Sequence, residues 1–146
     1  MKKLNTTCAA VAVALALISF SAAGHHSFAM YDLNQERTLT GKLTRFIPGA
    51  NHAQLVFELV DDNGESVVGA DGNPETWNVE MGPASRIANQ GITVKSFPLG
   101  SVITVTLNPL RNGRPMGALA GPVLKCGMEL PAGGCTADTG ESFGGR

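Results

Sequence analysis

The chain has 146 residues, with 11 Lys and Arg residues against 12 Asp and Glu residues, and a formal net charge of −1. This length accommodates one domain, and the charge provides no basic surface of the kind that nucleic acids require. With one Trp, one Tyr and six Phe, the chain also offers few aromatic side chains for base stacking. We therefore expect no nucleic-acid partner.

The first 23 residues have the pattern of a secretion signal. Lys2 and Lys3 precede an apolar run over residues 9–20, and small residues follow as far as Ala23. The run is too short for a stable spanning helix, which needs about 20 apolar residues. We predict a signal peptide over 1–23, a β-barrel domain over 24–125 and a Gly-rich tail over 126–146. The mature protein is then periplasmic or secreted, without a membrane span.

Five strands and one helix are expected in the mature chain. Alternation of apolar and polar residues, or β-branched runs, predict strands over 37–47, 52–60, 75–81, 102–107 and 116–125. In the first strand, the alternation puts Leu43 on one side and Phe46 on the other, and Gly41 marks a bulge or bend. A helix is expected within 82–91, where Pro83 suits its start and Gly91 its end. This order predicts an all-β fold with one short helix, a small five-stranded OB-like β-barrel.

The two cysteines that remain after signal removal are Cys126 and Cys135. In an oxidising compartment, they favour one disulfide that closes a short loop, worth about 2.5 kcal/mol in the chain-entropy model. A metal site built on these thiols is disfavoured, because their spacing fits no zinc pattern. Beyond the disulfide, the end of the tail from Ser142 is expected to be disordered.

Two of the three histidines lie where the signal ends. Cleavage after Ala23 leaves Gly24 first, so that the amine, two backbone nitrogens and the His26 imidazole can surround one ion. Cleavage after Gly24 puts His25 first, and its amine and imidazole can bind one ion together with His52, as a T-shaped brace. Nitrogen donors in a square plane suit Cu(II) or Ni(II). The alternative is a solvated N-terminus, with His52 making a local hydrogen bond at a strand end.

Several segments make the chain similar to the small secreted bacterial proteins classed as domain of unknown function 6152. The similarity covers about Gly24 to Leu124, and rests on the segments His25–Ala29, Thr40–Thr44, Asn51–Ala53, Trp77–Gly82 and Asn108–Arg114. It implies export and a β-barrel domain but brings no established activity. The tail with its two cysteines lies outside the similarity.

Other candidate groups are weaker than the histidines. Glu58 and Glu80 are expected on the polar faces of adjacent strands, where they are either an acid–base pair or two solvated carboxylates. Arg111 and Arg114 flank a turn and can hold a small anion, although exposed turn arginines are the simpler interpretation. No serine has the context of an activated nucleophile.

The sequence therefore predicts an exported, non-enzymatic β-barrel protein that binds copper through His25, His26 and His52. The alternative prediction is a periplasmic interaction module that binds a small ligand or a protein through the face of the barrel.

Overall fold

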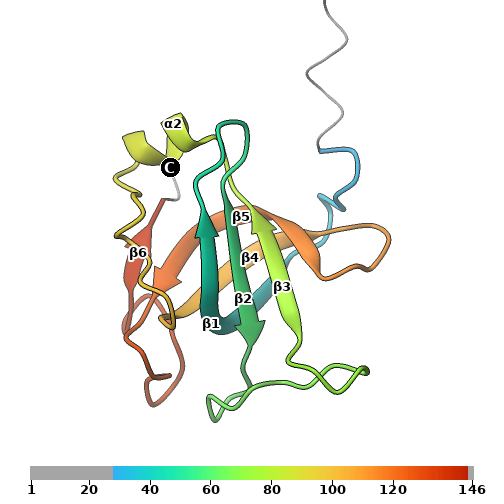
Figure 1. Ribbon diagram of the computed structural model, residues 1–146, viewed down its shortest axis with the longest axis vertical. Coiled ribbons are helices and arrows are strands. Elements are labelled where there is room, and N and C mark those ends of the chain that lie inside the picture. Colours follow the sequence, from blue (N-terminus) through green and yellow to red (C-terminus); the bar gives the residue numbers. More distant parts are fainter. Residues whose placement is uncertain (1–27, 145–146) are drawn as a thin grey trace, which may run out of the picture. The chain divides into compact units, whose positions relative to one another are not determined.

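The computed structural model describes residues 28–144 (Figure 1). The predicted signal peptide, His25 and His26 lie outside the described residues. The chain divides into two units, residues 1–30 and residues 31–146. The strands and the helix of the described part all belong to the second unit.

Five strands form a closed barrel, and a sixth is added at its edge. In chain order they are β1 (Arg37–Ile47), β2 (Gln54–Leu59), β3 (Thr76–Glu80), β4 (Val102–Pro109), β5 (Met116–Lys125) and β6 (Glu141–Phe143). Antiparallel pairing gives the order β3–β2–β1–β4–β5, and a parallel pairing of β3 with β5 closes the ring. Figure 1 shows β1, β2 and β3 in front, with β4 and β5 crossing behind them. The predicted five-stranded OB-like β-barrel is confirmed.

The inside of the barrel is filled by apolar side chains that alternate along the strands. Each of the five barrel strands contributes at least one fully buried residue: Leu43, Leu55, Phe57, Val79, Ile103, Val105, Leu107 and Val123. Trp77 is 5% exposed and belongs to the same cluster. Trp77 is therefore a core residue, and it also lines a surface cavity.

A β-bulge in β1 overturns part of the predicted alternation. The register with β2 shifts between Leu43 and Arg45. One extra residue in a strand reverses the side on which the following residues point. Phe46 therefore packs against the core, with its ring 5.6 Å from that of Phe97, while Arg45 is exposed. Gly41, where a bulge or bend was expected, pairs regularly with strands on both sides.

Helix α2 (Ala84–Asn89) follows β3 as predicted and lies beside the β1–β2 connection (Figure 1). The backbone N–H of Ala84 donates to the Gly49 carbonyl, which ties the start of the helix to that connection. Ile87 is the buried residue of the helix, and Gly91 ends it with φ of 79°. Between residues 28 and 144, no helix has the length and apolar character to cross a membrane.

The C-terminal segment contains the predicted disulfide between Cys126 and Cys135, with both residues buried. The expected disorder from Ser142 is wrong for the described part of the tail. Glu141–Phe143 form β6 and pair with the last three residues of β5. The Phe143 ring lies 5.0 Å from that of Phe97, and the Lys125 ammonium lies 2.9 Å from the Glu141 carboxylate. Packing of the partly buried Phe143 ring against the core offsets part of the entropy cost of ordering the tail.

Candidate functional site

One histidine of the described chain is held by a carboxylate. His52 lies just before β2 and Glu80 ends β3, and their backbones are adjacent because Gln54 pairs with Glu80. His52 Nδ1 is 2.9 Å from Glu80 Oε1. A carboxylate accepts hydrogen bonds, so Nδ1 carries a proton, and Nε2 is the ring nitrogen that Glu80 does not engage. Among residues 28–144, Nε2 has no hydrogen-bond partner.

Tyr31 fixes the same carboxylate from the other side. Its hydroxyl donates to Glu80 Oε2 at 2.9 Å. The residue is fully buried against Leu110 and Ala118, and it pairs with Leu110 in an isolated bridge. Burial, together with the hydrogen bond to Glu80, raises the pKa of Tyr31. The phenol therefore stays a hydrogen-bond donor at physiological pH, and Glu80 has one fixed partner on each oxygen.

Two amide side chains continue this polar face of the barrel. Asn78 Nδ2 donates to Gln54 Oε1 at 3.2 Å. Gln54 pairs directly with Glu80, and Asn78 lies two residues before Glu80 on the same face of β3. Asn78 Oδ1 is buried and has no hydrogen-bond partner in the described part of the chain. A buried oxygen without a partner is uncommon and marks a place where a donor is missing. The face thus combines a histidine, a carboxylate, a phenol and two amides.

The arrangement has the form of a metal-binding histidine with its supporting carboxylate. Histidines that bind metals almost always donate their second N–H to a carboxylate, a carbonyl or water, which orients the ring. His52 is 37% exposed at its side chain while Glu80 is 14% exposed, so the support is buried and the ring is accessible. Within residues 28–144, however, no three His, Cys, Asp or Glu residues form a group that could hold a metal. The other two predicted ligands, His25 and His26, lie outside the described residues.

The other predicted pair is not brought together. Glu58 pairs with Thr76, and Glu80 pairs with Gln54. Four residues along a strand correspond to about 13 Å, so Glu58 and Glu80 do not share a proton. The predicted pattern missed Tyr31, because its contact with Glu80 spans 49 residues and follows from no local signal.

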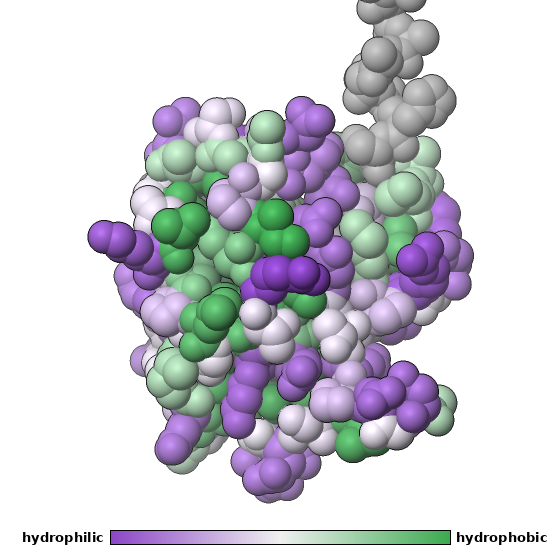
Figure 2. Space-filling model, viewed as in Figure 1, coloured by the Kyte–Doolittle hydropathy of each residue, from purple (hydrophilic) through white to green (hydrophobic). Residues whose placement is uncertain are grey.

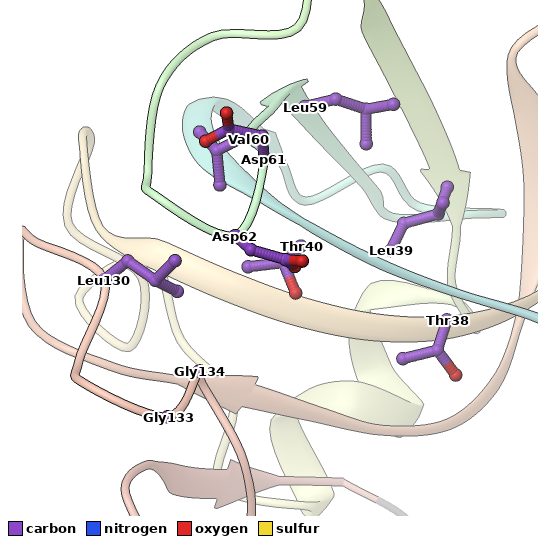
Figure 3. Close-up of a pocket in the computed structure, with 10 residues that line it drawn as sticks. All are labelled: Thr38, Leu39, Thr40, Leu59, Val60, Asp61, Asp62, Leu130, Gly133 and Gly134. Carbon is purple, nitrogen blue, oxygen red and sulfur yellow. The ribbon is translucent and has the colours of Figure 1, made fainter.

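A cavity of about 480 Å³ lies elsewhere on the barrel face (Figure 3). Its walls are the start of β1, the end of β2 with the turn after it, and the loop closed by the disulfide. Ten residues line it: Thr38, Leu39, Thr40, Leu59, Val60, Asp61, Asp62, Leu130, Gly133 and Gly134. The Thr40 hydroxyl lies 2.7 Å from the Thr104 hydroxyl. The backbone N–H groups of Glu65 and Asn63 donate to Asp61 and lower its pKa. Asp62 is therefore the better placed carboxylate for a ligand.

Comparison with known proteins gives one family. The model of a family described as of unknown function, DUF6152, matches residues 12–119, which is more than half of the chain. No curated protein matches, and no solved structure matches either.

Proposed function

The chain belongs to the DUF6152 family, and we propose that it is an exported, non-enzymatic protein that binds a copper ion at its processed N-terminus. Of the two possible ligand sets, the geometry favours the one that includes His52. In that set, His25 is the first residue and supplies its amine and imidazole, and His52 Nε2 is the third nitrogen. If processing leaves Gly24 first, His26 takes the place of these imidazoles.

The observation that carries the proposal is the hydrogen bond between His52 Nδ1 and Glu80 Oε1. It orients the ring, fixes the proton on Nδ1 and leaves Nε2 for a metal. Tyr31 holds the second oxygen of Glu80, so the supporting carboxylate is itself fixed.

The length of the chain is compatible with this ligand set. Five residues lie between His25 and Tyr31, and the six residue-to-residue steps of an extended chain span at most about 20 Å. Tyr31 is anchored through Glu80 to His52 by two contacts of 2.9 Å. The covalent connection is therefore long enough for His25 and His52 to bind one ion.

Calorimetric titration with Cu(II) tests the proposal on protein whose N-terminus the cell has processed and mass spectrometry has identified. We expect one equivalent to bind near neutral pH, and His52→Ala to abolish tight binding. Glu80→Gln should weaken it by about 10- to 100-fold, as loss of a supporting carboxylate does. Glu58→Gln is the matched control, because Glu58 lies on the outer face of the same sheet without contacting His52. Equal affinities of wild type and His52→Ala would exclude this ligand set.

Acidification should release the ion. Protons compete with the metal ion for the imidazole and amine nitrogens, so the apparent affinity falls as pH falls. One extra residue before the processed N-terminus should also weaken binding, because it displaces the amine.

A second candidate function is supported by the cavity beside β1. Its volume of about 480 Å³ lies in the range of small-molecule sites. Threonine hydroxyls and the Asp62 carboxylate favour a small polar ligand that donates hydrogen bonds. On the face drawn in Figure 2, hydrophobic residues lie among hydrophilic ones, and scattered exposed apolar residues need no partner.

A thermal-shift screen of small polyols and amines tests this second candidate. A true ligand should raise the melting temperature of the wild type and of Asp71→Asn, but not of Asp62→Asn. Asp71 is a suitable control because it is an exposed turn residue that does not line the cavity. Equal stabilisation of both variants would place the ligand outside the cavity.

A further inference from the structure

A second cavity, of about 170 Å³, is lined by three arginines. It lies where the lead-in to β1 meets the turn between β4 and β5. Arg37 comes from the start of β1, while Arg111 and Arg114 come from the turn. Asp32 is the one carboxylate in the lining, and Trp77 is its one aromatic ring. Four charged groups thus carry two more positive than negative charges.

The contacts of the three arginines do not neutralise the excess positive charge of the cavity. Arg111 Nη1 is 3.8 Å from Asp32 Oδ1, a long contact between side chains that are 56% and 22% exposed. The Arg37 guanidinium lies 6.0 Å from the centre of the Trp77 ring, which orients it without neutralising it. Within the described part of the chain, Arg114 has no carboxylate within ion-pair distance. The protein as a whole is slightly acidic, so this positive charge is local.

The backbone of the turn is fixed before any ligand arrives. The N–H of Arg114 donates to Asn112 Oδ1 at 3.1 Å, and Gly113 adopts φ of 76° and donates to the Leu110 carbonyl. Asp32 is tied to the same segment, because its N–H donates to the Pro109 carbonyl at 2.8 Å. A fixed backbone lowers the entropy cost of binding.

From the charge, the size and the donor chemistry, we propose that this cavity binds a small dianionic oxyanion such as inorganic phosphate. Guanidinium groups present paired N–H donors that match the oxygens of phosphate. The volume equals that of about six water molecules in the liquid, which suits a tetrahedral anion rather than a nucleotide. None of the arginines belongs to the proposed copper site, so the two proposals can fail separately.

The single tryptophan of the chain is a built-in reporter, since Trp77 lines the cavity. Phosphate, titrated at constant ionic strength against chloride, should change Trp77 fluorescence in a saturable way, and calorimetry should show matching heat. Arg114→Gln should weaken phosphate binding by about tenfold, the loss of one charge-assisted contact. Arg114→Lys keeps the charge without the paired donors and should lie between the two.

Arg86→Gln is the matched control, because Arg86 is an exposed arginine on α2 that does not line the cavity. It should bind phosphate like the wild type, with all variants giving the wild-type circular dichroism spectrum. Absence of saturable binding by both fluorescence and calorimetry overturns the proposal. So does a phosphate affinity of Arg114→Gln equal to that of Arg86→Gln, since the three arginines are then solvated independently.

Discussion

At the scale of single residues, Glu80 holds two other side chains of the candidate site, and no pattern in the sequence predicts these contacts. One of its oxygens holds His52, and the other accepts from Tyr31. Glu80 is on the polar side of β3, as the alternation predicts, yet its side chain is 14% exposed. Tyr31 contacts the Glu80 side chain, so this outward-facing position of β3 is partly buried and its carboxylate is held in place.

The environment of Tyr31 predicts a shifted ionisation. Its pKa is raised above the ordinary value of about 10, so the unfolded chain loses this proton at lower pH than the folded chain. The resulting stabilisation is complete below about pH 10 and is lost as pH rises beyond that value. Tyr31 is the single tyrosine, so phenolate absorbance reports it directly.

We expect phenolate formation in the folded protein to be delayed beyond pH 10 and to occur at lower pH in Glu80→Gln, because that variant removes the carboxylate's charge. A folded protein that titrates with an ordinary tyrosine pKa would contradict the described contact.

At the scale of elements, close approach of neighbouring atoms explains the glycine at position 117 of β5, but not the one at position 121. A Cβ on Gly117 would lie 2.5 Å from Leu107 Cδ1 and 2.8 Å from the Asn108 carbonyl oxygen. A Cβ on Gly121, in the same strand, would meet its nearest atom at 3.9 Å. The two positions look alike in sequence and differ in packing.

Gly117→Ala should therefore destabilise the fold by about 1–3 kcal/mol, as overpacking does. Gly121→Ala should be neutral or stabilise it by up to about 1 kcal/mol, because alanine restricts the unfolded chain. Urea unfolding of the two variants measures the difference. Equal losses of stability would show that β4 and β5 do not approach as described.

Reduction of the disulfide should lower the stability of the fold. Cys126 and Cys135 close a loop with a sequence separation of nine, so reduction should cost about 2.5 kcal/mol and lower the melting temperature by about 10 °C. Thiol titration before and after reduction, with thermal unfolding of each form, measures both effects. Two titratable thiols in the native protein would contradict the bridge.

The elements were largely predictable, because alternation and turn residues are local signals. The five barrel strands and the helix form close to their expected positions. Two features, the bulge in β1 and the strand β6, were not predicted from these local signals. The bulge in β1 inserts one residue between Leu43 and Arg45, and nothing local separates it from regular alternation. The strand β6 is stabilised by the contact between the rings of Phe143 and Phe97. These residues are far apart in the sequence, so the contact forms only in the folded chain.

At the scale of the whole molecule, the barrel places three separate polar regions on one small domain. They are the face around His52, the cavity beside β1 and the arginine-lined cavity at the β4–β5 turn. The sequence identified His52 as a candidate metal ligand and Arg111 and Arg114 as candidate anion-binding residues, because histidine and arginine commonly bind such ligands. It could not predict Tyr31, Arg37 or Asp32 as their neighbours, because strand pairing brings those residues together.

We propose that His52 and the processed N-terminus bind one copper ion together. Electron paramagnetic resonance of the Cu(II)-loaded, cell-processed protein tests it most directly, because it reports the nitrogen ligands. We predict three nitrogen ligands in the wild type and in Glu58→Gln, and two in His52→Ala. Identical spectra for the wild type and His52→Ala would contradict the claim.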